Sequence, residues 1–462
     1  MAGPSRSSGS RSPRPRRPDI ATQEQRGEAL LEVRELRTHF SLRGSFLDRV
    51  RGREVASVKA VDGVSLTLRR GEVLGIVGES GSGKTTLGRT LMGLIEASSG
   101  SVLFDGRDIT HLGEKRLRPV RRRLQIVFQD PHASLNPAMT IAASVGHPLT
   151  IHGVVSDEDE FGARVAEALE RVGLAPAQQF MDKYPGDLSG GQKQRAALAR
   201  AIILDPDVLI ADEPVSMLDM SVRAKILELM GELKQQLDLT YLYITHDLAT
   251  AKYFCDRIAI MYLGRIVEIG PAHDIYDDPK HPYTAALLRA IPEPDPRRSV
   301  PRDLPRGEVP DAVNPPLGCP FHPRCPSAFE VCGWESRDLR ALVEERWTRL
   351  PEEQFEGERA ILGELDSLDA PVTEARLEAA PGHGGDEALE IVERLRQDRP
   401  DDPFWRGVAE VRAEPAAVVV RFHEGIVPRE VSAAMSRVRC HLHDPEPLAR
   451  ARELSGAEAG SG

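Results

Sequence analysis

The chain has 462 residues, of which 40% are hydrophobic and 28% charged, and its formal net charge is −11. This balance is typical of globular proteins, and the length predicts two or three domains. No run approaches the roughly 18 apolar residues that a membrane-spanning helix needs. The acidic charge leaves no basic surface for a phosphate backbone, so we do not expect nucleic acid as a main partner.

Residues 1–28 are predicted to form a basic leader. Five arginines stand among Ser, Gly and Pro in residues 1–18, without the apolar stretch of a secretory signal. Such a composition is typical of a disordered segment, and contact with nucleic acid or anionic lipid is the alternative. We therefore expect a cytoplasmic chain with a disordered leader.

Two kinds of strand are predicted in the first half of the chain. Apolar and polar residues alternate in residues 30–40 and 61–68, which predicts antiparallel strands with one solvated face. Residues 73–77, 207–211 and 240–244 are mostly apolar without alternation, as in parallel strands buried on both faces. Polar residues follow each of these three strands, so we expect one active site at their carboxyl ends.

A phosphate-binding loop is predicted directly after the strand at 73–77. Its sequence fits G-x-x-x-x-G-K-S/T and leads into a helix that begins near Lys84. Backbone N–H groups of such a loop surround a phosphate, the lysine neutralises the β and γ oxygens, and the hydroxyl of Thr85 ligates Mg²⁺. The expected nucleotide-binding residues are Gly78, Glu79, Ser80, Gly81, Ser82, Gly83, Lys84, Thr85 and Thr86.

Two adjacent carboxylates follow the strand at 207–211. Asp212 is placed to hold Mg²⁺ through water, and Glu213 could act as the general base toward the attacking water. Two neighbouring carboxylates alone are weak evidence, so this assignment depends on the surrounding motifs.

The segment Leu188-Ser189-Gly190-Gly191-Gln192 stands shortly before Asp212 and resembles the signature sequence of ABC ATPases. The resemblance implies an α/β fold: a P-loop ABC cassette with a RecA-like parallel sheet core, an antiparallel β layer and a helical subdomain at about 130–200. Within that subdomain, Ser156 and Asp159 are expected to form a helix capping box.

The same resemblance assigns further site residues. It implies that Gln129 is the Q-loop residue and a Mg²⁺ ligand, Asp219 the D-loop residue, His246 the switch histidine, and Phe40 the aromatic that stacks on adenine. Ser189, Gly190, Gly191 and Gln192 would contact the nucleotide held by a second cassette. Because the chain has one P-loop and one signature, the working unit is expected to be a dimer of cassettes.

A C-terminal extension indicates which group of ABC ATPases the chain resembles. Residues 279–294, beginning Pro-Lys-His-Pro-Tyr-Thr, resemble the extension of oligopeptide/dipeptide importer ATPases, and the resemblance covers about residues 30–332. It implies an F-type ATPase member that powers peptide uptake from the cytoplasmic face of the membrane. The implied partners are a D-type ATPase paralogue, two membrane permeases and an extracytoplasmic solute-binding protein.

Other functions stay open from sequence. Importers of nickel and other small solutes use similar ATPases. A soluble ABC ATPase of translation or DNA repair would share the catalytic motifs, although such proteins usually carry two cassettes or a long coiled coil. A regulatory iron–sulfur protein that only senses nucleotide is less consistent with the intact set of catalytic residues.

Four cysteines, Cys319, Cys325, Cys332 and Cys440, stand in the C-terminal region. Their spacing is wider than in compact zinc sites and does not by itself name a metal. In the importer family, the resemblance implies a 4Fe-4S iron–sulfur cluster held by these thiolates. Zinc and unliganded thiols are the alternatives, whereas disulfides do not suit a cytoplasmic chain.

The expected domain boundaries follow from these segments. The cassette spans residues 29–278, the importer-type extension with the cysteine cluster 279–332, and the closing cysteine segment with the tail 438–462. Between them, residues 333–437 hold 24 Asp and Glu against 14 Arg, a net charge of −10. This insertion is either a small regulatory module, with a helix at 387–397 and a strand at 417–422, or a solvated acidic spacer.

Overall fold

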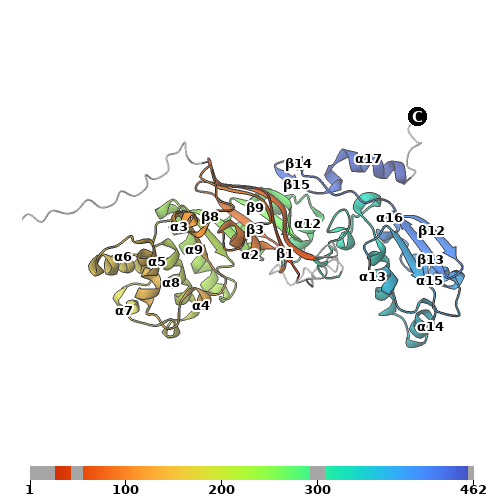
Figure 1. The fold of residues 1–462 in the computed structure, drawn as a ribbon, viewed down its shortest axis with the longest axis horizontal. Coiled ribbons are helices and arrows are strands. Elements are labelled where there is room, and N and C mark those ends of the chain that lie inside the picture. The colour runs from red at the N-terminus through yellow and green to blue at the C-terminus, as the bar shows by residue number, and fades with distance from the viewer. Residues whose placement is uncertain (1–26, 43–55, 292–306, 456–462) are drawn as a thin grey trace, which may run out of the picture.

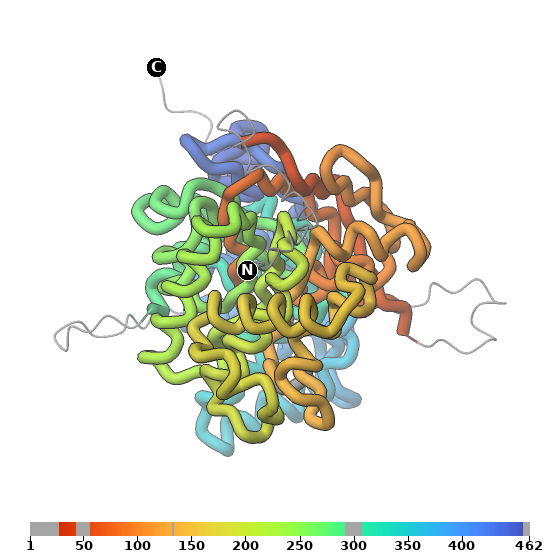
Figure 2. The backbone as a smooth tube through the Cα atoms, turned by 90° about the vertical axis from the view of Figure 1, so that its left-hand side faces the viewer, coloured from red at the N-terminus to blue at the C-terminus, as the bar shows by residue number. Residues whose placement is uncertain are grey.

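The computed structural model describes residues 27–42, 56–291 and 307–455. The predicted leader, apart from its last two residues, lies outside these ranges, as do residues 292–306 of the importer-type extension. Helices α4 to α8 lie at one end of the molecule, the main sheets lie in the middle, and the C-terminal region lies at the other end (Figure 1). The same order is seen end-on in Figure 2, where the yellow helices are in front of the cyan and blue segments.

An antiparallel layer of four strands, in the order β2-β1-β4-β5, covers one face of the central body. The alternating strands predicted from sequence are confirmed, because β1 and β2 pair antiparallel along most of their length. Their inward side chains, such as Leu31 and Leu66, share one core with Leu74 of the main sheet. The strands are β1 (Ala29–Ser41), β2 (Ser57–Arg69), β4 (Ser99–Phe104) and β5 (Arg107–Asp108).

The main sheet has eight strands in the order β14-β15-β10-β9-β3-β8-β7-β6. Strands β9, β3, β8, β7 and β6 are parallel, and β10, β15 and β14 extend this sheet antiparallel. The three predicted apolar strands are confirmed as β3, β7 and β8. The strands are β3 (Val73–Val77), β6 (Leu124–Val127), β7 (Val208–Asp212), β8 (Thr240–Thr245), β9 (Arg257–Tyr262), β10 (Arg265–Pro271), β14 (Val431–Ala433) and β15 (Ser436–Val438).

Both faces of this parallel sheet are buried, which explains its apolar strands. Leu74 and Ile76 of β3 face the core shared with the antiparallel layer. Val73 and Val77, on the opposite face, pack into the core shared with the helices. Since successive side chains of a strand point to opposite faces, every position of β3 has to be apolar or glycine.

Helices cover the second face of the main sheet and form the helical subdomain. Within that subdomain the predicted cap of α6 is wrong: Asp157, and not Ser156, accepts the hydrogen bond from the N–H of Glu160 (2.7 Å). In the described ranges, no helix combines the length and the apolar composition that crossing a bilayer requires. The helices up to residue 289 are α2 (Lys84–Leu91), α3 (Glu114–Arg123), α4 (Pro131–Ser134), α5 (Ile141–His152), α6 (Glu158–Arg171), α7 (Gln178–Met181), α8 (Gly190–Ile202), α9 (Met220–Leu237), α10 (Leu248–Phe254), α11 (Ala272–Asp277) and α12 (Pro282–Arg289).

The acidic insertion is a folded α/β module, so its interpretation as a solvated spacer is wrong. Its sheet has the order β11-β13-β12, and its core includes Trp334, Ile391 and Val420, as well as Phe329 before the insertion and Ala451 after it. The predicted helix and strand are present as α15 and β13. The elements are α13 (Ser336–Trp347), α14 (Glu352–Leu362), β11 (Glu374–Glu378), α15 (Gly385–Asp398), α16 (Phe404–Gly407), β12 (Val408–Glu414) and β13 (Ala417–Phe422), followed near the C-terminus by α17 (Pro445–Leu454).

Candidate functional site

The predicted phosphate-binding loop lies between β3 and α2, and two of its glycines are required by close backbone contacts. A Cβ atom on Gly78 would lie 2.1 Å from the carbonyl oxygen of Met261. At Gly83, the N-cap of α2, φ is 100° and a Cβ atom would lie 2.0 Å from the carbonyl oxygen of Ala60. The loop is therefore pressed against the neighbouring strands, with the first turn of α2 as its continuation.

Lys84 is buried inside this loop, with only 5% of the residue exposed. Its Nζ donates hydrogen bonds to the carbonyl oxygens of Gly78 (2.9 Å) and Glu79 (2.8 Å). Burial lowers the pKa of Lys84, and the negative charges of Glu213, Asp212 and Glu79 oppose that effect. The ammonium group is thus placed among carboxylates at the start of α2, where it could neutralise a phosphate.

Thr85 and Asp212 bring two oxygen ligands together. The Oγ1 of Thr85 donates to the Oδ1 of Asp212 at 3.1 Å, and Asp212 is buried at the end of β7. Burial raises the pKa of the Asp212 carboxyl, while the hydrogen bond from Thr85 lowers it. A hydroxyl and a carboxylate are ligands that Mg²⁺ prefers, so the pair fits the predicted magnesium site.

Glu213 meets the two other predicted catalytic side chains. Its Oε2 accepts a hydrogen bond from the Nε2 of Gln129 (2.9 Å) and lies 3.2 Å from the Nδ1 of His246. The backbone of Glu213 is left-handed, with φ of 47°, and its N–H donates to the carbonyl of Ile244 (2.9 Å). A strained non-glycine conformation of this kind persists where the surroundings hold it, and it is frequent at functional sites.

The signature residues lie apart from this group. Ser189 caps α8, where its Oγ accepts from the N–H of Gln192 (3.4 Å) and its own N–H donates to the side chain of Gln192 (2.9 Å). Asp219 caps α9 by accepting from the N–H of Val222 (3.0 Å). In the described residues, no hydrogen bond or ion pair links Ser189, Gly190, Gly191 or Asp219 to the phosphate-binding loop. Ser189, Gly190 and Asp219 are exposed at helix N-termini, where a second chain could meet them.

The remaining predicted residues are Phe40 on β1 and four residues of the loop and the first turn of α2. Phe40, on β1, is 42% exposed, so its ring has a solvent-accessible face. Ser82 is buried, and its Oγ has no hydrogen-bond partner among the described residues. Ser80, Gly81 and Thr86 occupy the loop and the first turn of α2. An unpartnered buried hydroxyl in this loop is consistent with a polar ligand.

Two residues that we did not predict also contact the loop. Arg324 and Tyr283, both from the C-terminal extension, bond to the side chain and the backbone of Glu79. The available signals were the HPYT segment around Tyr283 and the position of Arg324 among the cysteines. Neither signal indicates a contact across more than 200 residues of sequence.

The four C-terminal cysteines are free thiols; Cys319, Cys332 and Cys440 are buried, and Cys325 is half-buried. Burial raises the pKa of Cys319, Cys325 and Cys440 to about 12 and that of Cys332 further, and charge on neighbouring cysteines adds to each shift. Among the described side chains, no group of three or more His, Cys, Asp or Glu residues could hold a metal ion. The arrangement of side chains therefore gives the predicted iron–sulfur cluster, and equally zinc, no support.

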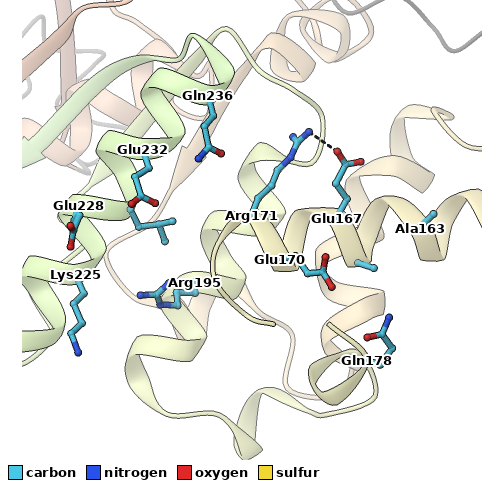
Figure 3. A pocket seen from close by; sticks show the side chains of 13 residues that line it. Ala163, Glu167, Glu170, Arg171, Gln178, Arg195, Lys225, Glu228, Glu232 and Gln236 are labelled. Atoms are coloured by element: carbon cyan, nitrogen blue, oxygen red, sulfur yellow. Dashed lines mark hydrogen bonds and ion pairs between the residues drawn. The ribbon is translucent and has the colours of Figure 1, made fainter. Parts of the chain in front are cut away.

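A cavity of about 1030 Å³ lies between α6 and α9, next to α8. Charged side chains of both signs surround it, and Arg171 pairs with Glu167 at its wall (Figure 3). It contains none of the predicted nucleotide-site residues. The phosphate-binding loop therefore lies outside this cavity.

Comparison with known proteins agrees with this geometry. The family model described as "ABC transporter" matches residues 61–216, and the model described as "Oligopeptide/dipeptide transporter, C-terminal region" matches residues 267–332. The oligopeptide transport ATP-binding protein AppF of Bacillus subtilis is 46% identical over 308 residues, which cover 66% of this chain and 92% of AppF.

A Brucella ovis protein named for peptide import and ATP binding is 46% identical over 313 residues, covering 68% of this chain and 94% of that protein. The dimeric ATP-binding cassette MJ0796 in a post-hydrolysis state, bound to ADP and Pi, is 27% identical and covers 52% of this chain and 98% of its own, with a TM-score of 0.46. From the 46% identity over 92% of AppF and 94% of the Brucella ovis protein, the chain belongs to the ATP-binding proteins of the oligopeptide/dipeptide ABC transporter family.

Proposed function

We propose that the chain binds and hydrolyses ATP and thereby powers the uptake of oligopeptides or dipeptides through partner permeases. The observation that carries the proposal is the convergence of Lys84, Thr85, Asp212, Glu213 and His246 at the carboxyl ends of β3, β7 and β8. The names of the relatives support peptides as the transported solute.

In the proposed reaction each side chain has one task. Backbone N–H groups of residues 78–86 would surround the phosphates, and Lys84 would neutralise their β and γ oxygens. Thr85 and Asp212, with Gln129, would hold Mg²⁺, which supplies charge neutralisation on the phosphate oxygens. Glu213 would accept the proton of the attacking water. His246, whose Nδ1 lies 3.2 Å from the Oε2 of Glu213, would contact the γ-phosphate, and Phe40 would stack on adenine.

Completion of the site is proposed to need a second cassette. Ser189, Gly190, Gly191, Gln192 and Asp219 are at the N-termini of α8 and α9, where helix dipoles favour a phosphate. These residues would contact the nucleotide of a D-type partner, with this chain as the F-type member. Two permeases and an extracytoplasmic solute-binding protein complete the proposed importer. This chain would lie at the cytoplasmic face of the membrane, where the residues that follow Gln129 would contact the permeases.

Trapping the closed complex tests this function. A Glu213→Gln chain, purified with ATP and Mg²⁺ from gently solubilised membranes, is expected to retain two permeases and a sibling ATPase, identified by mass spectrometry. The control is the same preparation without nucleotide, which shows whether closure of the two cassettes depends on ATP. Recovery of ribosomal or DNA-repair proteins and no permease would overturn the importer assignment, and nickel uptake by the complex would replace peptides as the solute.

We also propose Cys319, Cys325, Cys332 and Cys440 as ligands of a 4Fe-4S cluster. The support is the residue type alone, since the described side chains do not form a metal-binding group: four free thiols, three of them buried, lie near enough for the charge of one to affect the pKa of another. Such clusters are bound by four thiolates. Protein purified without oxygen is then expected to contain roughly four irons per chain and to absorb broadly in the visible range.

A matched pair of variants makes that experiment specific. Cys332→Ser should lose the iron, whereas Cys255→Ser should keep it, because Cys255 is a buried thiol of the cassette core. Folded wild-type protein that is colourless and free of iron would refute the cluster and leave the four cysteines as packed thiols.

A further inference from the structure

A buried arginine of the C-terminal extension contacts the phosphate-binding loop directly. Arg324 lies in the short 3-10 helix His322–Arg324, before Cys325, and is 9% exposed. Its Nη1 and Nη2 donate to the Oε2 (3.1 Å) and Oε1 (3.2 Å) of Glu79. Two parallel bonds of this kind make a bidentate pair, which fixes geometry as well as charge.

A tyrosine of the same extension holds the backbone of Glu79. The Oη of Tyr283, in α12, accepts a hydrogen bond from the N–H of Glu79 at 3.0 Å. Tyr283 packs against Tyr262 and Phe321, with ring centroids 4.6 Å and 5.3 Å away, and Arg324 bonds to the hydroxyl of Tyr262 (3.4 Å). Both the main chain and the side chain of Glu79 are thus fixed from outside the cassette.

Glu79 in turn contacts Lys84, the lysine of the phosphate-binding loop. Its carbonyl oxygen accepts a hydrogen bond from Lys84 (2.8 Å), and its carboxylate is one of the charges that act on Lys84. A carboxylate on a loop that receives phosphates would repel them unless a cation pairs with it. Arg324 supplies that cation from the C-terminal extension.

We propose that Arg324 is a positioning residue of the nucleotide site, which pairs the charge of Glu79 and holds the phosphate-binding loop in the shape that accepts MgATP. The C-terminal extension thereby becomes part of the nucleotide site, beyond any role in contacting other subunits. This inference rests on the proposed ATP binding.

The test is the affinity of the full-length chain for MgATP, measured by calorimetry. Arg324→Gln leaves Glu79 unpaired and is expected to raise the Kd by about tenfold. Glu79→Gln combined with Arg324→Gln removes the unpaired charge but does not restore the bidentate contact, so its Kd should lie between those of wild type and Arg324→Gln. Arg324→Lys keeps the charge but loses the bidentate geometry, so its Kd should also lie between those two values.

Arg346 provides a matched control, since it forms a similar pair with Glu358 (2.9 to 3.1 Å) inside the C-terminal module. Arg346→Gln should lower the unfolding temperature and leave the Kd unchanged. In the assembled complex, Arg324→Gln should raise KM for ATP more than it lowers kcat. An unchanged Kd in a folded Arg324→Gln chain overturns the inference, whereas wild type that fails to bind ATP overturns the proposed function itself.

Discussion

Replacing Glu213 with glutamine is expected to reduce steady-state ATP hydrolysis by the assembled complex at least about 100-fold, with ATP binding retained. The amide keeps the shape of the side chain, so its contacts with Gln129 and His246 have near equivalents. It cannot accept a proton from water, and the step that needs a base then stops. The measurements are phosphate release at saturating ATP and the Kd for MgATP.

Glu228 is the matched control for this substitution. It is an exposed glutamate on α9, at the wall of the cavity rather than in the nucleotide site. Glu228→Gln changes the same atoms and should leave turnover within about twofold of wild type, as expected of a surface substitution. Turnover by Glu213→Gln equal to that of Glu228→Gln would show that another group acts as the base.

Local sequence patterns predicted the cassette well, because short-range physics determines them. Alternation with period two identified β1 and β2, and unbroken apolar runs identified β3, β7 and β8. The G-x-x-x-x-G-K-S/T motif identified the loop glycines, and the structure gives the physical reason for them: a Cβ atom at Gly78 or Gly83 would collide with a neighbouring strand. Polar residues at parallel strand ends converge in any such sheet, which is why Thr85 and Asp212 could be paired from sequence.

Contacts distant in sequence could not be predicted in the same way. The bond between Arg324 and Glu79 spans 245 positions, and neither residue has a local pattern that indicates the other. The short strands β14 and β15 lie at the end of the acidic insertion and still extend the main sheet, with β15 paired to β10 and β14 paired to β15. Composition left both a solvated spacer and a folded module open there, because the many charges of the insertion lie mostly on the surface of the module and do not indicate its buried core.

The N-cap of α6 shows a second limit of prediction from sequence. Ser156 with Asp159 matched the capping-box spacing, but α6 begins one residue later than that pattern predicts, with Asp157 as its N-cap. In the structure the carboxylate of Asp157 accepts from the N–H of Glu160 (2.7 Å), a charged acceptor at the positive end of the helix dipole. Adjacent capping residues are therefore distinguished by the helix start, which sequence fixes only to within a residue or two.

Replacing Lys84 with methionine is the second large effect expected, and it falls on binding. The ammonium group now donates to the carbonyl oxygens of Gly78 and Glu79, and a phosphate would compete for these donor positions. Charge-assisted hydrogen bonds contribute about 1.5–3 kcal/mol each, so losing them is expected to raise the Kd for MgATP by about 100-fold. Calorimetric titration of the full-length chain measures this change.

The same substitution should also raise the pKa of the neighbouring Asp212 carboxyl, and this change reports on the charge of Lys84 rather than on its shape. Burial raises the pKa of the Asp212 carboxyl, and the charge of Lys84 lowers it. Because Lys84→Met removes that positive charge, Asp212 should require a higher pH to ionise. The residual Mg²⁺-dependent affinity for ATP should therefore improve as pH rises, whereas Lys225→Met, at an exposed lysine of α9, should match wild type. A Kd for Lys84→Met within about threefold of wild type would contradict the role assigned to the ammonium group, because one charge-assisted bond alone exceeds that difference.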